Sequence, residues 1–189
     1  MRVVVVGGGA VGAAVAMFLK REAGAAVQVT VVEPDPTLAL ASSARSAASI
    51  RQQFSNAVNV QLSRFGFEVI DQPGPWLAVD GQTPALGLQH ADYLFLATTE
   101  ALQCAQGATI ALLSPQALAQ ELPWLHTGDV LAATRGRGGE GWFDGEALAR
   151  ALAAKARALG AVWQRGRVVG GRLDGPRLAA LQLADGQTL

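Results

Sequence analysis

Residues 3–12 read VVVVGGGAVG, and this stretch decides the fold class. Four β-branched residues in a row are typical of a parallel strand buried on both faces, so residues 3–6 predict such a strand. Residues 7–12 satisfy the pattern G-x-G-x-x-G. Apolar residues then recur at the spacing of one helix face, at Val11, Val15, Phe18 and Leu19. The sequence therefore predicts a strand, a glycine turn and a helix in immediate succession.

The helix has a marked end, and a second strand follows it. Lys20 and Arg21 make its last turn basic, and Gly24 is placed as a C-cap, so we expect the helix to end near residue 22 or 23. A valine-rich run over residues 27–32 predicts a strand that ends at Glu33, 21 residues beyond the last glycine of the turn. Together these parts form the fingerprint of a Rossmann-type βαβ unit that binds a dinucleotide. A glycine-rich turn without a ligand is the alternative, and the complete register argues against it.

Each part of the glycine turn has a physical role in dinucleotide binding. Gly7 permits the tight turn, Gly9 lets the backbone approach a pyrophosphate, and Gly12 lets the helix and the strand pack closely. Ala10 and Val11 begin the helix, whose N-terminus offers free N–H donors and a positive dipole to the phosphates. These five residues are therefore candidate cofactor ligands.

Glu33 is the candidate ligand for the adenosine ribose. A carboxylate at the end of the second strand can accept hydrogen bonds from the ribose hydroxyls. The same charge repels a 2′-phosphate, so NADP is disfavoured. The fingerprint alone does not decide between FAD and NAD.

A serine-rich stretch follows, with Ser42, Ser43, Arg45 and Ser46 ahead of a segment that reads SIRQQF over residues 49–54. Small hydroxyl side chains allow a close approach and donate hydrogen bonds, while the arginines add fixed cationic forks. This composition suits phosphate or carboxylate contacts. Taken by itself, it is equally compatible with a solvated connection.

The rest of the chain predicts two interleaved regions. A helix capped by Ser55 or Asn56 carries Val58, Leu62, Phe65, Val69 and Ile70, and a short helix opens at Ser114 and Pro115. The clearest later strand covers residues 93–96. A helix from Asp144 to Gly160 precedes strands near residues 161–164, 167–173 and 178–184. We expect a cofactor domain over residues 1–75 and 138–189, with a strand-rich segment of a second domain at residues 76–137.

Composition narrows the function classes. Half of the 189 residues are hydrophobic, and fifteen basic side chains balance fifteen acidic ones, so neither nucleic acid nor an anionic membrane is favoured as a partner. The single cysteine, Cys104, excludes an internal disulfide framework and a cysteine-rich zinc site, and we expect it to be a small buried side chain. The glycines interrupt the uncharged run over residues 3–19, which is too short to span a membrane. We therefore expect a cytoplasmic protein that binds a small ligand.

Three motifs resemble the D-amino acid oxidase family of FAD-dependent oxidoreductases, which includes sarcosine and glycine oxidases. The first is the N-terminal fingerprint with Glu33. The second is SSARSAASIRQQF over residues 42–54, and the third is GWFD over residues 141–144, which leads into the helix that ends at Gly160. The resemblance implies an α/β fold in which a Rossmann-like FAD-binding domain carries a partial, strand-rich substrate domain.

The resemblance also implies roles for individual residues. Ser42, Ser43, Arg45 and Ser46 would contact FAD, and the backbone of Val169 would meet the adenine. Arg51 would lie near the flavin and could pair with a substrate carboxylate. A surface arginine or a structural ion pair is the alternative. Because the serine-rich stretch contains no histidine, we expect FAD to be bound non-covalently.

The activity implied by the resemblance is oxidation of a small amine or amino acid, by hydride transfer to the flavin and hydrolysis of the imine. Electrons would pass to oxygen, or to a quinone or carrier at the membrane. Members of the family are longer, so we expect this chain to be an N-terminal part. Two alternatives remain: a non-catalytic FAD-binding assembly or scaffold protein, and an NAD-dependent dehydrogenase.

Overall fold

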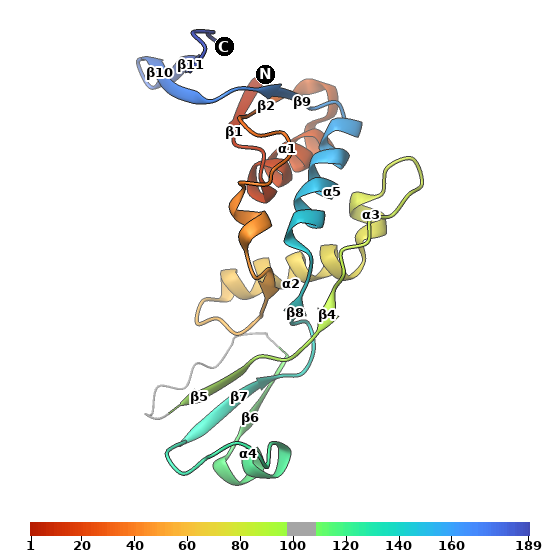
Figure 1. The fold of residues 1–189 in the computed structure, drawn as a ribbon, viewed down its shortest axis with the longest axis vertical. Helices are drawn as coiled ribbons and strands as arrows, with labels where there is room; N and C mark the ends of the chain where they lie inside the picture. The colour runs from red at the N-terminus through yellow and green to blue at the C-terminus, as the bar shows by residue number, and fades with distance from the viewer. Residues whose placement is uncertain (98–108) are drawn as a thin grey trace. The chain divides into compact units, whose positions relative to one another are not determined.

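The computed structural model describes residues 1–97 and 109–189, and Figure 1 shows their helices and strands. Cys104, predicted to be a small buried side chain, lies outside the described residues. The chain divides into two compact units. Unit 1 comprises Met1–Ser46, Leu77–Ala85 and Gly145–Leu189, and unit 2 comprises Ala47–Trp76 and Leu86–Asp144.

Unit 1 contains the predicted βαβ unit. Strands β1 (Arg2–Val6) and β2 (Gln28–Glu33) pair in parallel, with Val6 opposite Val32, and helix α1 (Ala10–Ala23) connects them. A short 3₁₀ helix, η1 (Gly24–Ala26), precedes β2. Strand β9 (Val162–Arg165) adds to β2 in parallel, which gives the sheet order β1-β2-β9. The carboxyl ends of these strands therefore lie at one edge of the sheet.

The exposure of β1 differs from the prediction. Burial on both faces was expected, but exposure alternates along the strand, and Val6 is 59% exposed while Val3 and Val5 are half-buried. Within the described residues, β1 is an edge strand of its sheet. One face of β1 is uncovered, and this explains why Val4 and Val6 are exposed. Its run of valines resembles that of a central strand, and the valine pattern does not distinguish the two.

The buried face of α1 also differs from the prediction. Val11 is 80% and Val15 is 45% exposed, whereas Ala13, Ala16 and Met17 are fully buried. The helix packs against α5 (Gly145–Ala158), which itself buries mostly alanines. Small side chains let two helix backbones approach closely, so the alanine face of α1 is buried and the valine face is exposed. The end of α1 is as predicted, at Ala23 with Gly24 as C-cap.

The remaining elements of unit 1 are a 3₁₀ helix and a hairpin. The helix η2 (Ser42–Arg45) covers the first part of the serine-rich stretch and packs near α5. Strands β10 (Val168–Asp174) and β11 (Arg177–Leu183) lie where strands were predicted and form an antiparallel hairpin. Leu181 and Leu183 are its buried residues.

Among its described residues, unit 2 contains two small sheets and three helices. One sheet has the order β3-β8-β4, from β3 (Ser49–Ile50), β8 (Gly141–Trp142) and β4 (Gln89–His90). The other has the order β5-β7-β6, from β5 (Leu94–Ala97), β7 (Ala132–Gly136) and β6 (Ile110–Leu113). The helices are α2 (Ala57–Asp71), α3 (Pro73–Leu77, whose last residue belongs to unit 1) and α4 (Pro115–Glu121).

Two helix caps in unit 2 were predicted correctly. The Asn56 side chain caps α2 by accepting the Val58 N–H at 2.8 Å. The Ser114 side chain caps α4 by accepting the Ala117 N–H at 3.2 Å. Of the apolar residues named for α2, Val69 and Ile70 are buried together with Val60, whereas Val58, Leu62 and Phe65 are exposed.

One hydrophobic cluster of unit 2 lies between α4 and the sheet β5-β7-β6. Its buried residues are Leu113, Leu118, Val130 and Ala133. The two compact units place residues 47–75 with the strand-rich region rather than with residues 1–46. Compactness does not by itself define a domain, so the expected domain boundaries remain a prediction.

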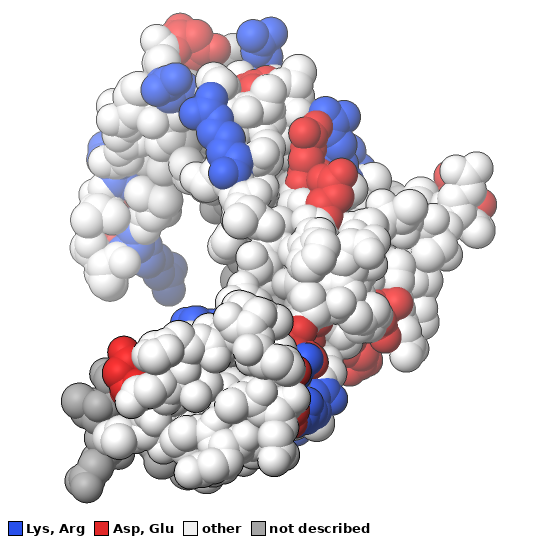
Figure 2. Space-filling model, turned by 60° about the horizontal axis from the view of Figure 1, so that its bottom comes forward, with Lys and Arg blue, Asp and Glu red and all other residues white. Residues whose placement is uncertain are grey.

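No helix in the described ranges is both long enough and apolar enough to cross a membrane. In the view of Figure 2, Asp and Glu side chains lie beside Lys and Arg in several places, with uncharged surface between them. The balanced formal charge of the sequence fits this mixture.

Candidate dinucleotide site

The turn between β1 and α1 requires glycine at two positions. The Gly7 N–H donates to the Val32 carbonyl oxygen at 2.9 Å, and Gly7 has a φ of +94°. A Cβ added to Gly12 would lie 1.9 Å from the Gly7 carbonyl oxygen. The turn therefore requires glycine at both positions, for backbone conformation at Gly7 and for close packing at Gly12.

The N-terminus of α1 begins directly at the turn. Gly9 is its N-cap, and no side chain caps the helix. The first N–H groups of a helix have no partner within the helix, and Gly9, Ala10 and Val11 stand at this start. The positive end of the helix dipole adds to these donors, so the turn offers the electrostatics that a pyrophosphate needs.

Glu33 lies against the same turn. Its Oε2 accepts the Gly8 N–H at 2.6 Å, and its Oε1 accepts the Asp35 N–H at 2.9 Å. The following loop is ordered by Thr37, whose side chain and backbone N–H bond to Asp35 Oδ1 and hold the pKa of the Asp35 carboxyl below its ordinary value. The end of β2 thus presents a carboxylate beside the glycine turn, with lone pairs left for further donors.

Gly8 and Trp163 belong to this site, although the sequence reasoning did not single them out. A Cβ on Gly8 would lie 2.9 Å from the Trp163 Nε1 and 3.1 Å from the Glu33 Cβ. The Arg157 guanidinium stacks over the Trp163 ring at 4.3 Å. Gly8 is the middle one of three consecutive glycines, and this additional glycine was the only sequence signal for a close approach there. Nothing local pointed to Trp163, which is 155 residues away in the sequence.

The serine-rich stretch supplies an unpartnered hydroxyl beside the turn. The Ser43 Oγ is buried and has no hydrogen-bond partner within residues 1–97 and 109–189. It lies 3.7 Å from the position that a Gly9 Cβ would take. A buried hydroxyl without a partner is unfavourable unless a ligand satisfies it, and a phosphate oxygen would do so. The residues present therefore fit the pyrophosphate of a dinucleotide.

The other predicted ligands in unit 1 are exposed. Ser42 and Arg45 are the two ends of η2, and Ser46 follows it. Val169 is 62% exposed and falls at a register shift of the β10–β11 hairpin, between Val168 and Gly170. Their contacts with a cofactor remain predictions.

Arg51 belongs to unit 2, so the structure does not place it relative to the turn. Its guanidinium stacks over the Phe54 ring at 4.7 Å and over the Phe95 ring at 5.2 Å. The Ser63 hydroxyl donates to its carbonyl oxygen. Within residues 1–97 and 109–189 its guanidinium forms no ion pair or hydrogen bond, so its donors are free for a ligand.

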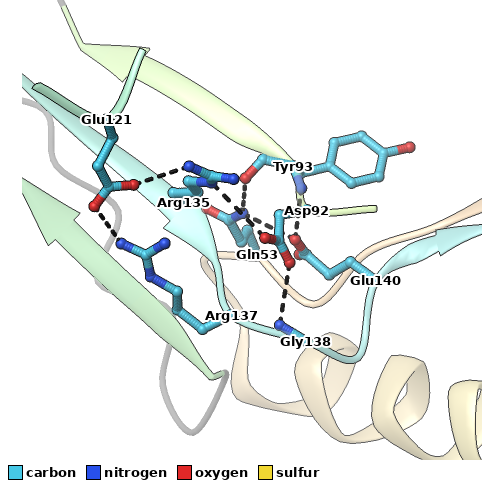
Figure 3. Close-up of polar contacts among 8 residues, drawn as sticks. All are labelled: Gln53, Asp92, Tyr93, Glu121, Arg135, Arg137, Gly138 and Glu140. Carbon is cyan, nitrogen blue, oxygen red and sulfur yellow. Dashed lines mark hydrogen bonds and ion pairs between the residues drawn. The ribbon is translucent and has the colours of Figure 1, made fainter. Parts of the chain in front are cut away.

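Unit 2 also contains a buried carboxylate that the sequence reasoning missed. Glu140 is 1% exposed, and its carboxylate accepts hydrogen bonds from the backbones of Gln52 and Tyr93 and from the side chain of Gln53. Figure 3 shows Gln53, Tyr93 and Glu140 converging, next to a separate network around Arg135. Nothing in the sequence marked Glu140 or its partners.

A protein-family model matches nearly the whole chain. The model described as "FAD dependent oxidoreductase" (DAO) matches residues 2–188. The protein "FAD-dependent oxidoreductase domain-containing protein 1" of Bos taurus is 39% identical over 178 residues, which cover 88% of this chain. The aligned part is 37% of the bovine protein, so the chain spans little more than a third of that relative's length.

Solved structures share the fold. A glycine oxidase from Geobacillus kaustophilus superimposes with a TM-score of 0.70 at 24% identity, covering 99% of this chain and 52% of that one. An L-α-glycerophosphate oxidase from Mycoplasma pneumoniae, solved with FAD bound, gives a TM-score of 0.67 at 18% identity and covers 95% of this chain and 48% of that one. The predicted Rossmann-like α/β fold is confirmed.

Proposed function

Because the chain belongs to the DAO family of FAD dependent oxidoreductases, we propose that the protein of which it forms part oxidises a small amine or amino acid. The predicted family and the predicted cofactor, FAD, are confirmed by this membership. The substrate class is supported by the names of similar structures, which include glycine oxidases.

The observation that carries the cofactor-binding part of the proposal is the Ser43 hydroxyl, which is buried beside the glycine turn without a partner among the described residues. In the proposed complex the N–H groups at the start of α1 and the Ser43 hydroxyl donate to the pyrophosphate. Glu33 accepts from the adenosine ribose, and the Val169 backbone meets the adenine. Residues 42–54 contain neither histidine nor cysteine, which supports non-covalent binding.

The residues of unit 2 would bind and orient the substrate. When bound, FAD supplies the acceptor for a hydride equivalent from the C–H bond beside an amine nitrogen, so the protein itself need not supply a general base. Arg51 is the candidate partner for a substrate carboxylate, because its guanidinium stacks over the Phe54 and Phe95 rings and forms no ion pair or hydrogen bond with the described residues. An arginine fork matches the geometry of a carboxylate and can bind it through two hydrogen bonds.

The test is a flavin reduction experiment on the purified full-length protein. We expect a yellow protein from which mass spectrometry recovers FAD, and whose flavin absorbance is bleached anaerobically by at least one member of a broad amine and amino acid panel. Recovery of NAD, or of no nucleotide, would contradict the cofactor assignment for this protein. Retained FAD with no reduction by any substrate would instead support the non-catalytic assembly role.

A further inference from the structure

We propose that Glu140 is a positioning residue for Arg51, whose role as the carboxylate-binding residue belongs to the proposed function above. Glu140 lies between β7 and β8, far from Arg51 in the sequence but within the same compact unit. The Arg51 guanidinium stacks over the rings of Phe54 and Phe95, which we call the aromatic cradle. The Glu140 carboxylate joins the two chain segments that carry these rings.

The first segment is the one that carries Arg51 itself. Glu140 Oε1 accepts the N–H of Gln52, the next residue, at 2.9 Å. The Gln52 side chain donates in turn to the Gly139 carbonyl oxygen at 2.9 Å. The segment with Arg51 and Phe54 is therefore attached at Gln52 to the loop that carries Glu140.

The second segment leads into β5 and carries the other ring of the cradle. Glu140 Oε2 accepts the Tyr93 N–H at 2.8 Å, and Phe95 follows two residues later. The Gln53 Nε2 donates both to the Tyr93 carbonyl oxygen, at 2.9 Å, and to Glu140 Oε2, at 3.3 Å. As Figure 3 shows, one carboxylate and one amide thus join the two segments directly.

The surrounding backbone is shaped to admit these side chains. A Cβ on Gly136 would lie 2.0 Å from Glu140 Oε2, and a Cβ on Gly139 would lie 1.8 Å from the Gln52 Nε2. Both glycines therefore leave space that Glu140 and Gln52 fill. This accounts for two of the glycines in residues 136–141.

A carboxylate meets a requirement that an amide cannot meet. Each Glu140 oxygen accepts from a different backbone N–H, and no cation pairs with Glu140 in the described part of the chain. In Glu140→Gln one oxygen becomes an NH₂ group, which would face an N–H donor and leave it unsatisfied. The segments would then shift, and a displacement of about 1 Å at a binding group can cost about 100-fold in function.

The test measures carboxylate binding rather than turnover. Benzoate and its uncharged analogue benzamide are titrated calorimetrically into the purified chain in the presence of FAD. We expect benzoate to bind better than benzamide, and Arg51→Gln to abolish that preference. Glu140→Gln should weaken benzoate binding by about 10- to 100-fold without weakening benzamide binding. The matched control Glu121→Gln removes another carboxylate of unit 2, which pairs with Arg135 and Arg137, and should leave benzoate binding unchanged.

Each further outcome decides between the two proposals. If Glu140→Gln is folded by circular dichroism and keeps full benzoate affinity while Arg51→Gln loses it, the positioning role is wrong and the role of Arg51 stands. If Arg51→Gln leaves benzoate affinity unchanged, the carboxylate-binding role is wrong and the inference falls with it. If Glu140→Gln does not fold, the variant Gln53→Met tests the inference instead. Gln53→Met should weaken benzoate binding by about threefold. Unchanged benzoate binding by Gln53→Met would overturn the inference.

Discussion

At the scale of a single residue, the glycine turn depends on the absence of a Cβ at Gly12. A side chain there would overlap the Gly7 carbonyl oxygen, so the strand and the helix could not keep their present separation. Two neighbouring glycines of the turn, Gly7 and Gly9, have no such close contact and serve conformation and ligand approach instead.

Gly12→Ala should therefore destabilise the protein by about 1–3 kcal/mol and abolish FAD binding, because overpacking forces the backbone apart. Gly66→Ala, in helix α2, is the matched control. A Cβ at Gly66 would have the Ile50 Cδ1, at 3.5 Å, as its only neighbour within 4 Å. This variant should stabilise the protein by about 0.5–1 kcal/mol through helix propensity. Thermal unfolding and FAD titration measure both variants, and equal behaviour of the two would contradict the close packing at Gly12.

Ser43→Ala should separate affinity from stability. The hydroxyl has no partner in the structure, so its removal should not destabilise the ligand-free protein. A lost hydrogen bond to a charged phosphate should weaken FAD binding by about 1.5–3 kcal/mol. Ser114→Ala, which removes the cap of α4, should show the reverse: a loss of about 1 kcal/mol in stability with unchanged FAD affinity. Full FAD affinity of Ser43→Ala would contradict the assignment of Ser43 as a ligand of the pyrophosphate.

Single residues show how far sequence reasoning reaches. The roles of Gly7 and Gly12 were predictable because a local motif carries them. Trp163 beside Gly8 and Glu140 beside Gln52 were not, because each contact joins residues far apart in the chain. The role of Arg51 was predicted by resemblance, and no local pattern indicated that its guanidinium stacks over the Phe54 and Phe95 rings.

At the scale of elements, the ends of helices were predicted better than their faces. Caps depend on one residue and its neighbours, so Gly24, Asn56 and Ser114 could be read directly. The buried face of α1 was misassigned because valine is more apolar than alanine, while close packing with α5 selects alanine. The two-sided burial of β1 was misjudged because burial depends on neighbouring elements.

The junction of α4 and β7 predicts a pH dependence. Hydrogen bonds from Arg137 and then Arg135 hold the pKa of the Glu121 carboxyl below its ordinary value of 4.5. A carboxyl with a lowered folded pKa stabilises the fold above its unfolded pKa, and this contribution is lost as the pH falls through the folded pKa. The melting temperature of Glu121→Gln should therefore lie below that of the wild type at pH 7, and the difference should shrink below about pH 4.5.

Melting curves recorded from pH 7 to pH 3 measure this difference. The pair is exposed, so the effect should be small, and 1 M salt should reduce it at pH 7. A difference that stays constant down to pH 3 would show that Glu121 acts through packing rather than through its charge.

At the scale of the whole molecule, the chain holds the complete dinucleotide fingerprint but only part of the length of its relatives. Ligand binding to the folded state alone should stabilise it by mass action. FAD at 100 times its dissociation constant should thus add about 2.7 kcal/mol to the free energy of unfolding of this chain. ADP should reproduce part of the effect and riboflavin none of it, because the turn and Glu33 are expected to bind the AMP half. Thermal shift assays with the three ligands check this order.

A titration of the purified chain with FAD, alongside Glu33→Gln, tests the assignment of the site most directly. Glu33→Gln keeps the size of the side chain but replaces one acceptor of the ribose hydroxyls by a donor and removes the charge. The wild type should bind FAD, and Glu33→Gln should bind it at least about tenfold more weakly. Equal affinity of the two proteins, or no FAD binding by a folded wild type, would contradict a site built from the glycine turn and the carboxylate at the end of β2.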